Sequence, residues 1–271
     1  MSEEIAIYEV DDKIGIITMN RPDKLNALSI DLKAALVAAF AKADEDPNTS
    51  VVVLRSNGRS FCAGYDLGAP PKKPEDAHDP LKWHASLTPS LAMEMTPWYM
   101  SKPVICSVQG HALGGGCELT MFCDMTIAAD NALFGEPEGR FTGTGPGFIM
   151  PWLIGYKKAR ELLYLGDMIS AQEALALGMI NKIVPADELR EATIKYAKRL
   201  ALIAPEALKM TKLAINRGAD ASGFRNAMQA GIDVVAPLYA AKTAVGDEFK
   251  DRIAKDGLPS ALKWRTGQFK Q

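Results

Sequence analysis

The chain has 271 residues, of which 48% are hydrophobic and 24% charged, a composition typical of a globular protein with a large core. Its 31 basic residues nearly balance its 33 acidic residues, so bulk charge gives no reason to expect binding to nucleic acid or to an anionic membrane. The four cysteines form no CxxC pair and the histidines number only three, which favours reduced thiols and argues against a disulfide framework or a metal site. The acidic N-terminus lacks an apolar segment and no stretch is long enough to span a membrane, so we expect no signal peptide and a cytoplasmic location.

The first 200 residues alternate between strand and helix patterns. Apolar and β-branched runs predict strands at 5–10, 14–19, 51–54, 104–108, 125–129, 132–134 and 179–184. Caps and helical spacing predict helices that start after Ser29, over 81–100, from Cys117, over 158–165, after the 170–173 capping box and over 189–200. The proline-rich segment 68–80 is expected to be a surface loop. The methionine and aromatic residues of 81–100 suit either the core or the wall of an apolar pocket.

From about residue 200 onward the pattern is helical and predicts no further strong strand. Pro205 at a helix start and Gly218 after its end bracket a helix over 206–216. We therefore expect an α/β fold in which residues 1–200 form the core with the functional site and residues 201–271 form a helical C-terminal region.

Two turns of small residues each follow a predicted strand. Gly114, Gly115 and Gly116 come after the strand at 104–108 and lead into a helix with Glu118 in its first turn. Ala63-Gly64-Tyr65 forms the second turn. Backbone N–H groups at a helix start attract negative charge, so the glycine turn could bind a phosphate or stabilise an oxyanion. One N–H from each turn could together form an oxyanion hole. The alternative is a tight glycine turn in which Glu118 only complements the helix dipole.

Two carboxylates, Glu118 and Glu138, follow turns next to strands and could face one pocket. Paired carboxylates whose environments separate their pKa values suit general acid and base catalysis on a carbon acid or on water. Each glutamate taken singly could equally be a solvated surface group.

Several motifs occur in an order that resembles the crotonase superfamily, the enoyl-CoA hydratase/isomerase family. They lie at 20–22, 26–28, 60–67, 102–104, 110–119, 123–124, 134–138, 169–174 and 178–181 and cover nearly the whole chain. The resemblance implies a spiral of repeated ββα units, a C-terminal helical trimerisation region and a homotrimer or dimer of trimers. It also implies an acyl-CoA thioester substrate, with coenzyme A as part of the substrate and no separate cofactor or metal.

The resemblance also implies roles for individual residues. The thioester oxygen would accept hydrogen bonds from the backbone N–H groups of Tyr65 and Gly115. Glu118 would orient and deprotonate water, and Glu138 would deliver a proton to the α-carbon. The positions implied in substrate and coenzyme A binding are Lys24, Leu25, Ala27, Ala63, Gly64, Asp66, Leu67, Gly114 and Pro137. Because both glutamates are present, we expect a hydratase that adds water reversibly and syn across the 2,3 double bond of a 2-enoyl-CoA through an enolate.

The segment at 139–152 departs from the family pattern, because it lacks the Gly-Gly and the Thr-Gln-Arg that usually follow the second glutamate. This keeps two alternatives open, a double-bond isomerase and a hydratase-lyase acting on an aromatic or branched acyl-CoA. A non-catalytic RNA-binding or scaffold protein is disfavoured by the paired glutamates and the lack of a basic patch.

Other residues of the site region each leave more than one role open. Arg140 could pair with Glu138 and lower its pKa, recognise a polar acyl group, or form a surface salt bridge. His84 could be an auxiliary acid or base, or a structural histidine. Cys62 and Cys117 are interpreted as small buried side chains.

Overall fold

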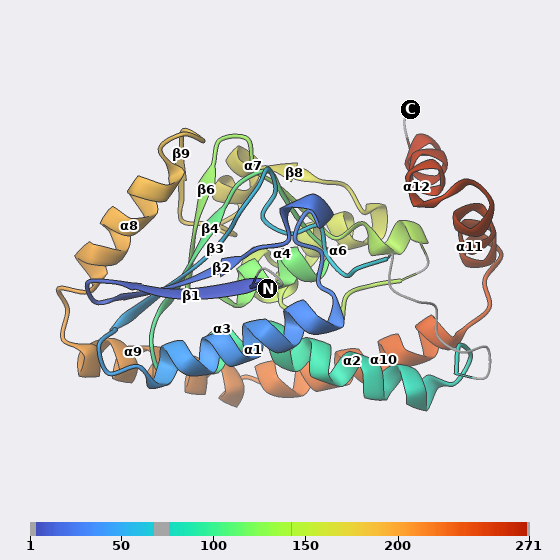
Figure 1. The fold of residues 1–271 in the computed structure, drawn as a ribbon. Helices are drawn as coiled ribbons and strands as arrows, with labels where there is room; N and C mark the ends of the chain where they lie inside the picture. Colours follow the sequence, from blue (N-terminus) through green and yellow to red (C-terminus); the bar gives the residue numbers. More distant parts are fainter. Residues whose placement is uncertain (1–3, 68–75, 142, 270–271) are drawn as a thin grey trace.

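The computed structural model describes residues 4–67, 76–141 and 143–269, and its centre is a six-stranded sheet (Figure 1). The strand order is β1-β2-β3-β4-β6-β9. Its strands are β1 Ala6–Asp11, β2 Ile14–Met19, β3 Val51–Ser56, β4 Val104–Val108, β6 Met125–Ala129 and β9 Lys182–Val184. The β1–β2 pair is antiparallel and every other neighbouring pair is parallel. Strands β2 and β4 are buried along their whole length, as the continuous apolar runs of parallel strands require.

A second, three-stranded sheet has the order β5-β7-β8 and lies at the carboxyl ends of the first. It consists of β5 His111–Leu113, β7 Leu133–Gly135 and β8 Ile169–Ser170. An isolated parallel bridge from Cys62 to Ala112 extends it towards the segment that follows β3. Successive units thus place one strand in each sheet, β4 with β5 before α4 (Gly115–Phe122), and β6 with β7. The predicted crotonase-like spiral is confirmed.

Helices cover both faces of the large sheet. Helix α8 (Leu189–Leu200) packs on the face formed by Ile16, Val53 and Ile105. The other core lies under α1 (Ile30–Glu45), α2 (Pro80–Glu94), α4 and α10 (Phe224–Ala240), around fully buried residues such as Phe40. The remaining helices of the first 200 residues are α3 Thr96–Tyr99, α5 Met150–Ile154, α6 Tyr156–Leu165 and α7 Ala171–Ala176, with 3₁₀ turns η1 Pro22–Lys24 and η2 Pro137–Phe141.

The C-terminal part is helical, as predicted. It contains α9 Pro205–Ala221, α10, α11 Ala244–Asp256 and α12 Leu258–Gly267. The predicted helix end at Gly218 is wrong, because α9 continues to Ala221 and the break comes at Gly223, whose φ of 97° is left-handed. Helices α11 and α12 turn back and contact η2, at the end of the molecule opposite α8 (Figure 1). No helix in the described ranges combines the length and apolar character needed to cross a bilayer.

Most local predictions agree with the structure. Ser29 caps α1 by accepting from the Leu32 N–H at 3.2 Å, and Ser170 and Glu173 form the reciprocal capping box of α7. The strand predicted at 179–184 is shorter in the structure, where β9 begins only at Lys182. Before regular pairing begins, the Asn181 side chain accepts a hydrogen bond from the Thr126 N–H at 2.7 Å. The helix expected over 81–100 divides into α2 and α3, and most of the proline-rich loop, residues 68–75, lies outside the described residues.

Candidate functional site

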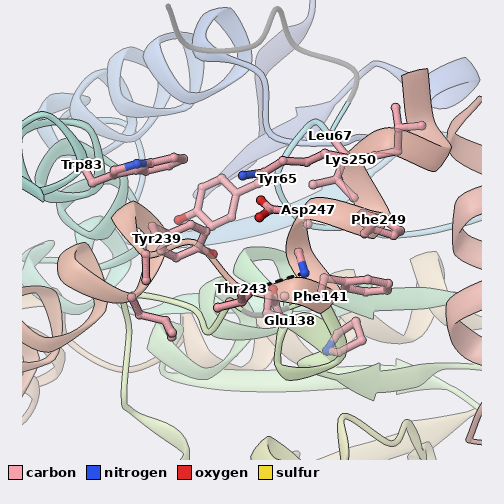
Figure 2. A pocket seen from close by; sticks show the side chains of 18 of the residues that line it. Tyr65, Leu67, Trp83, Glu138, Phe141, Tyr239, Thr243, Asp247, Phe249 and Lys250 are labelled. Atoms are coloured by element: carbon pink, nitrogen blue, oxygen red, sulfur yellow. Dashed lines mark hydrogen bonds between the residues drawn. The ribbon is translucent and has the colours of Figure 1, made fainter. Parts of the chain in front are cut away.

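A cavity of about 280 Å³ opens where the small sheet, η2, α10 and α11 meet (Figure 2). Residues from both halves of the chain line it: Ala63, Gly64, Tyr65, Leu67, Trp83, Gly114, Pro137, Glu138, Phe141, Gly143, Leu238, Tyr239, Ala241, Thr243, Gly246, Asp247, Phe249, Lys250 and Ile253. Most are apolar or aromatic, so the cavity suits an apolar ligand with a few polar contacts.

The two predicted turns lie against each other at one end of this cavity. Hydrogen bonds from the Cys62 N–H to the His111 carbonyl and from the Leu113 N–H to the Cys62 carbonyl, both 2.9 Å, pair the segments that carry them. Gly64 has a φ of 90°, and a Cβ there would lie 2.8 Å from the Leu113 oxygen. The close approach of the turns therefore depends on glycine.

The backbone N–H groups of Tyr65 and Gly115 have no carbonyl acceptor within the described ranges. Gly115 is the first residue of α4, where the helix dipole adds positive potential. The Tyr65 ring covers Gly115 so closely that a Cβ on this glycine would lie 2.8 Å from the ring edge. Tyr65 thus lines the cavity, and its ring lies over Gly115 at the start of α4.

Glu138 lines the cavity from η2. Its Oε2 is buried and has no hydrogen-bond partner among the described residues, while its backbone carbonyl accepts from the Gly143 N–H at 2.9 Å. Burial raises the pKa of this carboxyl from 4.5 to about 7. The side chain can therefore exist in either protonation state near neutral pH.

Glu118 lies in the first turn of α4, as predicted, but it is fully buried and does not line the cavity. Its Oε1 accepts from the Gly147 N–H at 2.8 Å, and its Oε2 has no partner in the described ranges. Burial, followed by the charges of Glu94, Glu136 and Glu138, raises the pKa of Glu118 well above its ordinary value. The structure brings the two predicted glutamates into one buried cluster, with Glu138 on its open side.

Two further acidic residues in this cluster were missed from the sequence. Glu94, the last residue of α2, is fully buried, and its Oε1 accepts a short hydrogen bond from the Tyr65 hydroxyl. Burial raises the pKa of Glu94 to about 8. Glu136, next to Pro137, is also buried, with its pKa raised well above the usual value mainly by burial. The sequence signal that could have identified Glu94 is its spacing of three residues from the apolar Leu91. This spacing puts an acidic side chain on the apolar face of the helix.

Two aromatic pairs form the walls of the cavity (Figure 2). Trp83 of α2 stacks on Tyr239 of α10, with ring centroids 4.9 Å apart. Phe141 of η2 packs against Phe249 of α11 at 4.7 Å. The aromatic-rich stretch 81–100 therefore serves both predicted purposes, since Trp83 lines the cavity while Leu91 and its neighbours fill the core.

Of the three roles left open for Arg140, the structure shows a salt bridge, and its partner is Asp167, not Glu138. The Arg140 guanidinium forms an ion pair with Asp167 and donates from Nε to the Leu165 carbonyl at 2.7 Å, and its side chain is only 10% exposed. These partners draw Arg140 towards the C-terminus of α6, so it anchors η2 from outside. His84 has the structural role that the sequence left open, because its Nε2 lies 3.1 Å from an Asp233 oxygen at the outer edge of α2 and α10, and the residue does not line the cavity.

The residues implied in substrate binding divide into two groups. Ala63, Gly64, Leu67, Gly114 and Pro137 line the cavity, and Lys24, Leu25, Ala27 and Asp66 do not. The 24–27 loop nevertheless borders the first turn, because the Leu25 carbonyl accepts from the Ala63 N–H at 3.0 Å.

The structure gives several polar and thiol side chains near the site a packing role. Asp66 forms an ion pair with Arg21 at 3.2 Å. Cys62 and Cys117 are fully buried, as interpreted from the sequence. No group of three or more potential metal ligands occurs in the part of the chain that the structure describes.

The two sheets, the spiral connections and the C-terminal helices define the crotonase fold, and comparison with known proteins places the chain within it. An enoyl-CoA hydratase/isomerase family model matches residues 9–243, and the chain belongs to this family. It is 31% identical over 279 residues to the probable enoyl-CoA hydratase echA8 of Mycobacterium bovis, covering 99% of both proteins.

Solved structures agree with this assignment. An enoyl-CoA hydratase/isomerase from Xanthobacter autotrophicus Py2 superposes with a TM-score of 0.93 at 32% identity, covering 98% of this chain and 99% of that one. A probable enoyl-CoA hydratase from Mycobacterium thermoresistibile gives 0.79 at 35% identity, covering 86% and 96%. The family and fold inferred from the sequence motifs are therefore confirmed.

Proposed function

We propose that this protein is an enoyl-CoA hydratase that adds water reversibly and syn across the 2,3 double bond of a 2-enoyl-CoA. The observation that carries the proposal is a pair of buried carboxyl oxygens, one on Glu118 and one on Glu138, which have no partner among the described residues. A buried polar atom without a partner costs about 1–3 kcal/mol, and a water molecule held between the two glutamates removes that cost. The same cluster adjoins the N–H groups of Tyr65 and Gly115.

In the proposed reaction the thioester oxygen accepts hydrogen bonds from the Tyr65 and Gly115 N–H groups. These donors stabilise the negative charge that develops on this oxygen as the enolate forms, and one such donor typically contributes about 2.7–4 kcal/mol to transition-state stabilisation. The start of α4 adds favourable potential to the same position.

The glutamates move the two protons that the addition requires. Water attacks C3 and loses one proton to the Glu118 carboxylate, while Glu138 gives its proton to C2. One C–O bond and one C–H bond form, the π bond is lost, and the net change is addition of one water. Both groups act from one side of the substrate, so the addition is syn. The pKa of about 7 supports Glu138 as the acid, because much of it is protonated at neutral pH.

We further propose that the coenzyme A portion extends past Ala63, Gly64, Asp66 and Leu67 towards the loop of Lys24, Leu25 and Ala27, with Gly114 and Pro137 beside the acyl group. The hydrogen bond from the Ala63 N–H to the Leu25 carbonyl supports this course, because it joins the 24–27 loop to a segment that lines the cavity. The residues 201–271 are proposed to assemble the chain into a trimer or a dimer of trimers, as the family resemblance implies.

A double-bond isomerase is the second candidate, and one observation favours it. Of the two glutamates, only Glu138 lines the cavity, while Glu118 is covered and already bonded to Gly147. Moving a proton between C2 and C4 needs one carboxyl group, not two. The aromatic walls formed by Trp83, Tyr239 and Phe141 favour a planar or aromatic acyl group in either reaction.

A screen of 2-enoyl-CoA and 3-enoyl-CoA thioesters with aliphatic and aromatic acyl groups tests these proposals. Loss of enoyl absorbance with a gain of one water in product mass supports the hydratase. An unchanged mass with a moved double bond supports the isomerase and rules out the hydratase assignment.

The Glu138→Gln variant tests the role of the acid. We expect kcat to fall by about 10²–10⁴-fold, the usual contribution of a general acid, while acyl-CoA still binds. Calorimetric titration with a saturated acyl-CoA measures binding separately from turnover. Full activity in this variant would remove Glu138 from the mechanism.

A further inference from the structure

Glu94 is a fully buried acid that the proposed reaction does not use. It ends α2 and reaches into the site, where its Oε1 accepts from the Tyr65 hydroxyl. A Cβ on Gly115 would lie 2.6 Å from this same oxygen, so the Glu94 carboxyl lies directly beside one proposed oxyanion donor.

The carboxyl group of Glu94 also lies within hydrogen-bonding reach of the carboxyl group of Glu118. Each of the two has one oxygen, Oε2, that is buried and takes no donor from the described residues. Two carboxylates cannot hydrogen bond each other when both are ionised, whereas one proton between them satisfies an oxygen on each side. The arrangement therefore has the geometry of an acid–carboxylate pair.

Charged and titratable groups surround this pair on every side. Glu136 and Glu138 add negative charge from the segment after β7, and Tyr65 and Tyr239 present hydroxyl groups from the first turn and from α10. The charge of Lys33 of α1 also acts on Glu94; its Nζ donates to Ser90 Oγ at 2.7 Å and lies 5.5 Å from the Tyr65 ring centre. This predominantly acidic surrounding further disfavours ionisation of both carboxyls together.

We propose that Glu94 is a positioning residue that shares one proton with Glu118 and holds Tyr65 over the oxyanion hole. The inference rests on the proposed hydration for its role in turnover, although the shared proton itself does not depend on it. In that reaction the pair begins with one proton. As Glu118 takes a proton from the attacking water, the shared proton passes to Glu94, so the pair ends with two protons and Glu138 ends ionised. The proton that Glu138 needs for the next turnover is then present in the same cluster.

An infrared titration of carboxyl groups tests the shared proton without any substrate. In the wild-type protein, the second carboxyl group of the Glu94–Glu118 pair must ionise next to the negative charge of the first, so it loses its proton last. We expect both Glu94→Gln and Glu118→Gln to move this last step to lower pH by more than about one unit, since each removes that repulsion. Glu45→Gln on the exposed end of α1 is the matched control and is expected to leave the step unchanged.

The proposal would be overturned if Glu94 and Glu118 ionised independently of each other. Removal of Glu94 would then delete one ionisation step from the infrared titration and leave the ionisation of Glu118 at its wild-type pH. Circular dichroism checks that each variant is folded, and either variant alone gives the comparison if the other does not fold. Kinetics supply the second readout, with kcat of Glu94→Gln expected to fall about 10-fold or more and KM to stay within about 2-fold. If the titration shows the shared proton but the protein hydrates no enoyl-CoA, the proposed function is refuted, and the inference that Glu94 and Glu118 share a proton still holds.

Discussion

The position of Glu118 depends on a glycine that faces it, and Gly145→Ala tests that dependence. A Cβ at Gly145 would lie 2.6 Å from Glu118 Cδ and 2.8 Å from its Oε2, against the 3.4 Å at which ordinary contacts begin. The carboxyl must therefore move by about 1 Å, which also weakens its 2.8 Å bond to the Gly147 N–H. A misplacement of about 1 Å in a catalytic group can cost on the order of 10²-fold in rate.

We expect Gly145→Ala to lower kcat for hydration by about 10²-fold with little change in KM, because Gly145 does not line the cavity. Steady-state loss of enoyl absorbance measures both constants. The matched control is Gly218→Ala, which adds the same methyl inside α9, where a Cβ meets no atom within 4 Å. This control is expected to keep wild-type kinetics and to gain up to about 1 kcal/mol in stability. Wild-type kcat in Gly145→Ala would refute the reasoning that Glu118 needs its present position.

Two further predictions concern stability. Because burial raises the folded-state pKa of Glu138 to about 7 and of Glu94 to about 8, against 4.5 when unfolded, the folded protein binds more protons between these values. The contribution of these two carboxyl groups to stability is complete below pH 4.5 and is lost as the pH rises through 7 to 8. The urea midpoint of unfolding is therefore expected to fall as the pH rises from 4.5 to 8, and to fall less in Glu94→Gln. An equal fall of the midpoint with pH in the wild type and the variant would contradict this. Lys212→Met removes a buried cation, 6% exposed, that donates to Asp124 at 2.7 Å and to the carbonyls of Pro97 and Lys102. We expect the free energy of unfolding, measured by urea denaturation, to fall by about 2–4 kcal/mol, which is less than for a fully buried pair because Asp124 is 24% exposed. A change under about 0.5 kcal/mol would show that the ion pair contributes nothing to stability.

The features that were predicted correctly from the sequence are those that residues close together in the chain determine. Strand β2 and helix α8 have the predicted bounds, because their apolar spacing suits only one type of element. The pairing of the two glycine turns was also predictable, since each follows a strand of one parallel sheet and the carboxyl ends of those strands meet at one edge.

The rest of the site depends on contacts between distant segments. Glu94 reaches Glu118 only because α2 packs against α4, and no local pattern encodes that contact. The sequence left the partner of Arg140 open, and the ion pair forms with Asp167, which lies just after α6. Gly218 was interpreted as a helix end, yet α9 continues through it to Ala221, because one glycine inside a helix costs only about 1 kcal/mol.

Helix α11 contributes one wall of the cavity from outside the segment that the family model matches. The family match ends at residue 243, one residue before α11 begins, whereas Asp247, Phe249 and Ile253 of that helix line the cavity. The groups proposed to carry out the reaction all lie within the matched segment. Part of the cavity wall therefore lies outside the stretch that holds the proposed proton-transfer groups, so exchange of α11 between homologues is expected to change the acyl preference while those groups keep their places.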